Sequence, residues 1–521
     1  MLQIRKINAI FALTLKNFHT FAKILETMNL TKAIMWGTLS IPMLSQAARQ
    51  QKPNVLIVIS DDHSVPFVGC YDNRDVQTPH LDKFAKEGMI FWRGYVTCPQ
   101  SAPSRASILT GRSPIITMTS RFGAPLDRSI ITYPEYLIKE AGYYAGLCGR
   151  THHQDGKPGV TGSFTDKYYH ERKLSTMESR MQYVKTASGD AEGGQGKMIE
   201  QFYEFMEVRD KSKPFYLQFC FTDPHRPYTA PKVHDPNTLT LPYHYPDTQG
   251  VREDLAAYYD EVHRADRTFG EAMEYLEKNG LKEHTLVIFL GDNGAAQFRG
   301  KGTLYELGIN VPLLIRWPGV VKPGGVCREV ISMEDLGPTV MEAAGLQPKP
   351  DMTGISFLPM LEGNPAPTRQ YAFAERGPHA DGIPSDVNNA FDQARVIVSK
   401  DYKLIYNCQP TLKQAPVDFS HAPFYQELIA MNEKGQLEEK FVNFYFWETP
   451  RPLLEFYDLK NDPSETNNVA TDKAYFDAKE EMLKELILWM IQERDYLPLP
   501  IKLVESEKVE SKKVNVKKQV K

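Results

Sequence analysis

The chain has 521 residues, a net charge of −4 and a pI near 6.4. Proteins that bind nucleic acid are usually basic, so this charge argues against that class of partner. No apolar run reaches the roughly 18 residues of a membrane span, and the length allows a large core and about two domains. The composition therefore predicts a globular protein with no nucleic-acid partner and no membrane-spanning segment.

The N-terminal residues 1–50 are typical of an extension that contains an export signal. Residues 28–47 have a charged start, a short apolar segment and small residues before Ala47, which is the order found in signal peptides. Because signal peptides begin at the start methionine, we expect translation to begin at Met28; an amphipathic N-terminal helix is the alternative. No Cys follows the apolar segment, so we expect no membrane anchor. The signal peptide predicts an exported protein, periplasmic or extracellular.

The first element of the folded part is an apolar run at residues 54–60, which predicts a buried parallel strand. Asp61 and Asp62 follow its carboxyl end, where open α/β sheets bind their ligands. Two adjacent carboxylates repel each other unless a cation lies between them, and their oxygens suit Ca²⁺ or Mg²⁺. We therefore predict a cation site here, with a solvated Asp-Asp turn as the alternative. A helix should follow at residues 79–87, with Thr78 as its N-cap and Gly88 ending it.

The next segment is Ser101-Ala102-Pro103-Ser104-Arg105, followed by Leu109-Thr110-Gly111. Pro103 suits the first turn of a helix, and Ser101 would then lie at the positive end of that helix, where an oxyanion is favoured. A Ser N-cap on an ordinary helix is the alternative.

The same segment resembles the signature of type I sulfatases, which belong to the alkaline-phosphatase superfamily. In that family the first residue of the signature, usually Cys and sometimes Ser, is oxidised to formylglycine (3-oxoalanine). The resemblance implies that Ser101 is the modified residue. Cys98 is not, because Ala102 stands where a motif counted from Cys98 requires Arg.

Two further strands lead to histidines that match this family. The strand before Gly149 is followed by Arg150 and His152, where the family has G-K-x-H, so Arg150 replaces the usual Lys and keeps its positive charge. The strand at residues 215–221 is followed by His225, the second His of the family's H-x-P-H. A lone His after a strand is often structural, but the edge expected to carry Asp61 makes a site role more favourable.

A helix from about residue 253 to 278 leads into a strand at 285–290, which ends at Asp292-Asn293. Asp-Asn-Gly is a common turn, but after a buried strand it matches the family's second pair of metal ligands. Lys301 matches its sulfate-contacting Lys. The resemblance implies one Ca²⁺ per chain, held by Asp61, Asp62, Asp292, Asn293 and the side chain of residue 101. It implies the catalytic residues Ser101, Arg105, Arg150, His152, His225 and Lys301.

These elements predict an α/β fold with a large, mixed, mostly parallel sheet sandwiched by helices. We expect a catalytic domain at residues 51–365, a smaller C-terminal α+β subdomain at 366–498 and a disordered tail at 499–521. The subdomain should hold shorter strands, a closing segment at 454–470 that resembles the family's C-terminal motif, and a helix at about 473–493.

The resemblance implies a hydrolase of sulfate esters or sulfamates of a glycan, such as a glycosaminoglycan or a mucin-type saccharide, and a maturation enzyme that makes formylglycine. Several motifs are closest to the heparan N-sulfatase branch. Arg376 and His379 are candidates for binding an acidic sugar, with a surface turn as the alternative. Two other functions remain open: a phosphodiesterase or phosphonate hydrolase that uses unmodified Ser101, and a non-catalytic protein that binds sulfated glycans.

Overall fold

The computed structural model describes residues 52–500 except 121–125, 152–176, 187–193, 367, 379–391, 413–415 and 446–450. The expected signal peptide and residues 501–521 of the expected tail lie outside these ranges. Residues Pro53–Lys521 form a single unit by their internal contacts. No helix within the described ranges is long and apolar enough to cross a bilayer.

An eight-stranded mixed sheet forms the centre of this unit, with strand order β5-β4-β6-β1-β7-β8-β2-β9. The five strands from β5 to β7 are parallel, whereas β8 runs antiparallel to both of its neighbours, β7 and β2. The strands are β1 Asn54–Ser60, β2 Met89–Phe91, β4 Tyr144–Gly149, β5 Tyr183–Thr186, β6 Phe215–Cys220, β7 Thr285–Gly291, β8 Leu313–Arg316 and β9 Gly325–Cys327. A separate parallel pair joins β3 Gly94–Tyr95 to β10 Ile331–Ser332.

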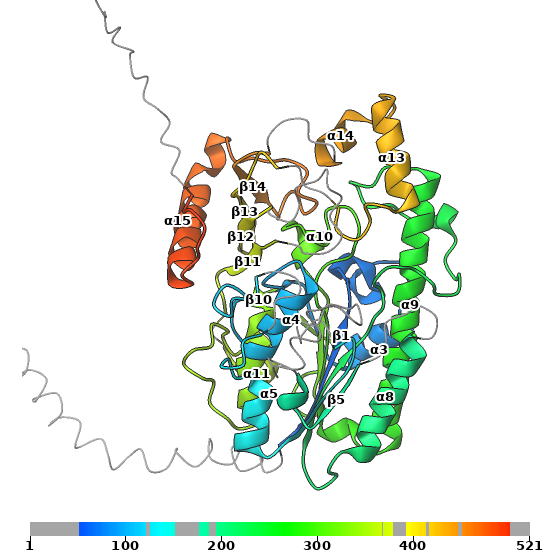
Figure 1. Cartoon of the computed structure of the whole chain (residues 1–521), viewed down its shortest axis with the longest axis vertical. Helices are drawn as coiled ribbons and strands as arrows, with labels where there is room; N and C mark the ends of the chain where they lie inside the picture. The colour runs from blue at the N-terminus through cyan, green and yellow to red at the C-terminus, as the bar shows by residue number, and fades with distance from the viewer. Residues whose placement is uncertain are drawn as a thin grey trace, which may run out of the picture. The chain divides into compact units, whose positions relative to one another are not determined.

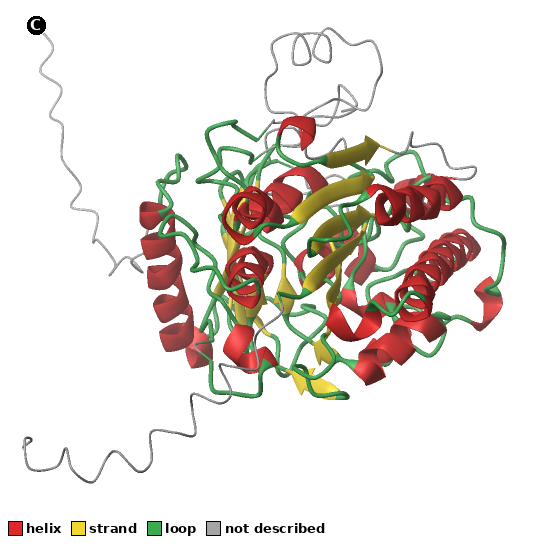
Figure 2. Ribbon diagram, turned by 90° about the horizontal axis from the view of Figure 1, so that it is seen from below, coloured by secondary structure: helices red, strands yellow, loops and turns green. Residues whose placement is uncertain are grey.

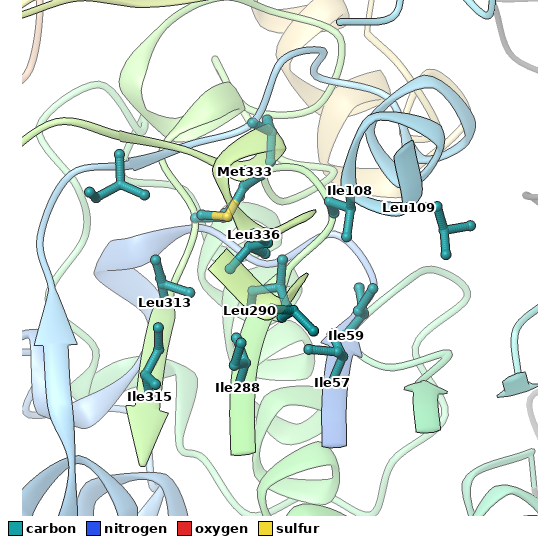
Figure 3. Close-up of a cluster of buried hydrophobic side chains, with 14 of the residues drawn as sticks. Ile57, Ile59, Ile108, Leu109, Ile288, Leu290, Leu313, Ile315, Met333 and Leu336 are labelled. Atoms are coloured by element: carbon teal, nitrogen blue, oxygen red, sulfur yellow. The ribbon is translucent and has the colours of Figure 1, made fainter. Parts of the chain in front are cut away.

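Helices cover both faces of the large sheet (Figures 1 and 2). Side chains on β1 alternate between the faces: Val55, Ile57 and Ile59 join one core cluster, while Leu56 and Val58 join the other. One face packs against α4, α5 and α11, and Figure 3 shows Ile57, Ile288 and their neighbours in this cluster. The other face packs against α3, α8 and α9. The helices are α3 Pro79–Glu87, α4 Ser101–Thr110, α5 Tyr133–Tyr136, α8 Gly194–Val208, α9 Gln249–Lys278, α10 Glu306–Ile309, α11 Leu336–Ala343 and α12 Leu358–Leu361.

The C-terminal part adds an antiparallel four-stranded sheet, in the order β11-β12-β13-β14. Its outer face packs against α15, and its inner face contributes Ala374, Val396 and Tyr457 to the core of the large sheet. The two sheets therefore share a hydrophobic core. The elements are β11 Ala372–Arg376, β12 Ala394–Val398, β13 Tyr402–Asn407, α13 Pro423–Glu433, α14 Glu439–Tyr445, β14 Leu454–Asp458 and α15 Phe476–Gln492.

The predicted fold class is confirmed, and most element boundaries differ by only a few residues. The helix expected from about residue 253 begins at Gln249, because the side chain of Thr248 accepts a hydrogen bond from the backbone N–H of Val251 and caps the helix earlier. Thr78 and Gly88 flank α3 as predicted.

Gly149, the last residue of β4, is a position that only glycine fits. Its φ is +86°, and a Cβ there would collide with the carbonyl oxygen of Cys220 on β6. We expect Gly149→Ala to lower the free energy of unfolding by at least about 2 kcal/mol, from the left-handed backbone and the clash together. Gly280 has a φ of +67° and open space around it, so Gly280→Ala should cost only about 1 kcal/mol. Urea unfolding of both variants measures the difference between their free energies of unfolding. Equal losses of stability in the two variants would contradict the clash at Gly149.

Candidate active site

The candidate site lies at the carboxyl ends of the neighbouring strands β6, β1 and β7. Asp61 follows β1 and Asp292 follows β7, and both are fully buried. Backbone hydrogen bonds join the strand ends: the N–H of Asp61 donates to the carbonyl of Asp223, and the N–H of His63 donates to the carbonyl of Asn293. Residues distant in sequence therefore meet because parallel strands end at the same edge of the sheet.

Ser101 is the first residue of α4, and Gln100 is its N-cap. Pro103 lies in the first turn, as predicted. The Ser101 hydroxyl is fully buried, 2.9 Å from the amide oxygen of Asn293 and 3.3 Å from a carboxylate oxygen of Asp61. The N-terminal end of α4 thus brings the serine hydroxyl to the acidic strand ends, where the helix dipole favours a negatively charged group.

Asp62 and Asn293 are held in fixed orientations. Asp62 has a left-handed backbone with a φ of +62°, a conformation that Asp tolerates better than most residues. Its backbone N–H donates to Asp292 (3.0 Å), and its carbonyl accepts a hydrogen bond from the Tyr258 hydroxyl of α9 (2.9 Å). The side-chain amide of Asn293 donates to Asp62 (2.8 Å) and to the Gly294 carbonyl. These bonds direct the amide oxygen of Asn293 toward Ser101.

Three basic side chains pair with the buried carboxylates. Arg105 contacts Asp292 (2.8 Å) and Asp61 (3.3 Å), and the guanidinium of Arg150 contacts Asp61 (2.8 Å). Lys301 lies 2.8 Å from Asp62. Because an unpaired charge is costly to bury, each carboxylate stabilises a neighbouring cation and is stabilised by it.

The pKa values of these groups depend on both burial and charge. Burial raises the pKa of Asp61, but Arg150 and Arg105 outweigh this effect and hold the pKa well below its ordinary value. Burial raises the pKa of Asp292 to about 6, with Arg105 opposing the shift and Asp61 adding to it. Burial lowers the pKa of Lys301, but the nearby carboxylates Asp418 and Asp62 reverse this, so the pKa lies above its usual value.

His225 follows β6 and lies at the outer side of this cluster. Its Nδ1 contacts the carbonyl of Arg226, and its Nε2 lies 3.3 Å from the Arg150 guanidinium and 3.8 Å from Asp62. Arg226 itself forms a bidentate pair with Asp254 of α9 and stacks on the Tyr228 ring. This anchoring fixes the loop so that Nε2 faces the carboxylates.

Most of the predicted site residues meet here. Asp61, Asp62 and His225 have ligand atoms within 4.8 Å of one another, a separation that suits a shared metal ion. Ser101, Arg105, Arg150, Asp292, Asn293 and Lys301 surround the same point through the contacts above. His152 and His379 lie outside the described residues.

Arg376 is buried, which excludes the surface turn that was the alternative for it. It is 1% exposed, and its guanidinium lies 3.1 Å from Asp392 and donates to the carbonyl of Gly302 (2.5 Å). Arg376 is the last residue of β11, and its side chain lies between the C-terminal sheet and the loop that carries Lys301. Arg376 thus joins the C-terminal sheet to the Lys301 loop, and its role in binding a sugar stays a prediction.

Asp418 is a site residue that the sequence did not indicate. Its carboxylate lies 2.6 Å from Lys301 and 3.5 Å from Nε2 of His225. It comes from the loop between β13 and α13, and no motif or strand end marks it in the sequence. Only the packing of the C-terminal part against the large sheet brings it here.

Comparisons with family models identify the class. The model described as Sulfatase matches residues 53–346, and the model described as N-sulphoglucosamine sulphohydrolase, C-terminal, matches residues 294–424. The chain therefore belongs to the sulfatase family. It is an enzyme of the class that hydrolyses sulfate esters or sulfamates.

Two relatives show how far the likeness extends. An ulvan-active sulfatase from Formosa agariphila is 27% identical over 463 residues, covering 87% of this chain and 82% of the relative. Human N-sulphoglucosamine sulphohydrolase is 27% identical over 494 residues, covering 86% of this chain and 91% of the relative. The family's sequence pattern thus extends through both sheets.

Solved structures agree on the alkaline-phosphatase-like fold. One, determined with its substrate D-glucosamine-2-N,6-O-disulfate, has a TM-score of 0.63 at 20% identity and covers 86% of this chain and 99% of that one. The phosphonate monoester hydrolase of Agrobacterium radiobacter has a TM-score of 0.64 at 18% identity, covering 85% and 96%. At these identities the likenesses establish the fold alone.

The structural role of Arg376 can be tested by removing its charge. Arg376→Met leaves Asp392 buried with only Arg451 as a cationic partner among the contacts described. We expect a loss of up to about 3 kcal/mol in the free energy of unfolding, measured with urea, and an unchanged KM for a sulfated substrate. Arg74 is exposed, so Arg74→Met should cost less than about 0.5 kcal/mol. A raised KM without lost stability would support Arg376 as a substrate-binding residue.

Proposed function

We propose that this chain hydrolyses sulfate esters or sulfamates of a glycan, using formylglycine made from Ser101 and one Ca²⁺. The observation that supports this most is the location of the Ser101 hydroxyl, at the start of α4 and beside the oxygens of Asp61 and Asn293. A buried serine surrounded by carboxylates and three basic side chains fits a reacting group better than an ordinary N-cap.

The donor set fits a hard divalent cation. Asp61, Asp62, Asp292 and Asn293 offer carboxylate and amide oxygens, all fully buried at neighbouring strand ends, and Ca²⁺ prefers oxygen ligands of this kind. A divalent cation would also reduce the repulsion among the three carboxylates. We propose that these four side chains and the oxygen of residue 101 hold the ion.

The site chemistry follows from the charges of its residues. Bound Ca²⁺ would supply Lewis-acid stabilisation of the sulfate oxygens, and formylglycine would supply the nucleophilic oxygen. Arg105, Arg150 and Lys301 are positioned around the same carboxylates and would stabilise the remaining negative charge of the sulfuryl group. Asp292, which comes directly before the Asn293 that contacts Ser101, would accept a proton from the nucleophile.

The leaving group requires a proton, and His225 is the proposed donor. Its Nδ1 is turned to the Arg226 carbonyl, so Nε2 faces the site, which is the geometry of a general acid. His152, which the family resemblance assigns to the nucleophile and to sulfate release, stays a prediction. The overall reaction consumes one water and yields the free alcohol or amine and inorganic sulfate.

The relatives support a sulfated glycan as the substrate. One acts on ulvan by its name, another on N-sulphoglucosamine, and a structural neighbour was solved with a disulfated glucosamine. We propose a glycosaminoglycan or a similar sulfated saccharide, degraded after export to the periplasm or the extracellular space. The proposal includes a separate maturation enzyme that oxidises Ser101. We further propose that residues 51–365 form the catalytic domain and residues 366–498 the C-terminal subdomain.

A phosphonate hydrolase is the second candidate, because a phosphonate monoester hydrolase shares the fold. Enzymes that use an unmodified serine in this superfamily usually hold two metal ions. Within the described ranges, Asp61, Asp62 and His225 form the only group of three or more such side chains close enough to share an ion. This favours one metal ion and the sulfatase.

Ser101 provides the first test of the proposed function. In protein co-expressed with a formylglycine-generating enzyme, we expect the Ser101 peptide to lose two hydrogens in mass. Ser101→Ala should lower kcat for sulfate release by roughly a thousandfold or more, because the nucleophile is gone. Cys98→Ala is the matched control and should keep its activity. Full sulfate release by protein with an unchanged Ser101 mass would rule out formylglycine.

Metal binding provides the second test. Calcium at about 100 times its Kd should stabilise the chain by about 2.7 kcal/mol in urea unfolding, with one ion per chain by elemental analysis. Asp62→Asn should abolish most of this stabilisation, because it removes a charged ligand. Asp477→Asn, an exposed change at the start of α15, should not. Two ions per chain, or equal stabilisation of Asp62→Asn and the native chain, would contradict the proposed site.

A further inference from the structure

The segment Val417–Phe419 is built so that it projects one side chain into the site. Val417 and Phe419 are 5% and 6% exposed. Phe419 packs against the rings of Phe298 and Phe424. Val417 occupies the space where a Cβ of Gly302 would lie, directly beside Lys301. The two apolar side chains therefore fix the segment on both sides of Asp418.

Asp418 itself has a left-handed backbone, with a φ of +67°. This conformation turns its carboxylate away from the two buried neighbours and toward Lys301 (2.6 Å) and His225 (3.5 Å). Asp adopts this conformation more readily than most residues, and the buried neighbours Val417 and Phe419 hold it here. The orientation of Asp418 is thus a property of the fold, not of a freely moving side chain.

The exposed fractions of the side chains show that Asp418 lies on the solvent-facing side of the site. The side chains of Asp61 and Asp62 are 0% exposed and that of Lys301 is 2% exposed, whereas those of His225 and Asp418 are 17% and 27% exposed. The site therefore opens past His225 and Asp418. A sulfuryl group bound among the buried charges would have its leaving group on this open side, next to the proton donor.

We propose that Asp418 is a specificity-determining residue, which accepts a hydrogen bond from a donor on the leaving group of the substrate. This assignment rests on the proposed function. The donor is either the N–H of a sulfamate or a hydroxyl of the sugar that bears a sulfate ester. The carboxylate accepts from both, and such charge-assisted hydrogen bonds are stronger than neutral ones.

The charge of Asp418 has opposite effects on two kinds of ligand. An inorganic sulfate ion has no sugar to donate a hydrogen bond, is repelled by the carboxylate and competes with it for Lys301. A sulfated sugar meets the same repulsion but gains the hydrogen bond. Removing the charge should therefore strengthen binding of sulfate and weaken binding of the sugar, which no general loss of structure would do.

The test uses titration calorimetry in calcium-containing buffer, with Ser101→Ala as the background so that no turnover occurs. The probes are sodium sulfate, glucosamine N-sulfate and glucosamine 6-sulfate. Asp418→Asn keeps the shape of the side chain and removes its charge. Asp477→Asn is the matched control on the same C-terminal part. Thermal unfolding of each variant confirms that it is folded.

We expect Asp418→Asn to bind at least one of the sugars about tenfold more weakly, the contribution of one hydrogen bond to a charged group, and to bind sulfate at least as tightly as the background. Loss confined to glucosamine N-sulfate identifies the sulfamate N–H as the donor, and loss confined to glucosamine 6-sulfate identifies a hydroxyl. Weakening of all three probes, or of none, overturns the assignment and leaves the proposed function intact. If neither the Ser101→Ala chain nor the chain with unmodified Ser101 binds any probe, the proposed function fails and this assignment fails with it.

Discussion

The structure depends on the concentration of buried negative charge at one edge of the large sheet. Asp61, Asp62 and Asp292 are fully buried at the ends of two adjacent strands. Such a group is stable only with cations around it, and Arg105, Arg150 and Lys301 reach it from three different segments. The site at this edge of the sheet is therefore a balance of opposite charges.

The C-terminal part contributes directly to this site. The inner face of its sheet shares the core of the large sheet, Gln100 donates to the carbonyl of Gly377 (2.9 Å), and Arg376 donates to that of Gly302. These bonds fix the segments that carry Ser101 and Lys301. Asp418 adds a carboxylate beside Lys301 and His225, so a part of the chain far from the strand ends contributes to the charges of the site.

The predictions from sequence succeeded where local patterns have a direct physical meaning. Apolar runs of strand length gave β1, β6 and β7 nearly to the residue, because a buried parallel strand must be apolar on both faces. Acidic and amide residues directly after those strands had to meet at one edge of the sheet. The burial of Arg376 could not be predicted, because a charged residue in a polar stretch gives no local sign that a distant carbonyl and Asp392 enclose it.

The sequence by itself determined the fold class, the chain's membership of the sulfatase family and the group of residues around Ser101, since these depend on periodicity, strand ends and a contiguous motif. The tertiary structure alone decided which charges pair, how Arg150 reaches Asp61 and that Asp418 joins Lys301 and His225. Those contacts connect segments that lie far apart in the sequence, and their geometry depends on how two sheets pack through a common core. No local pattern encodes that packing, because many different side chains can fill the same buried volume.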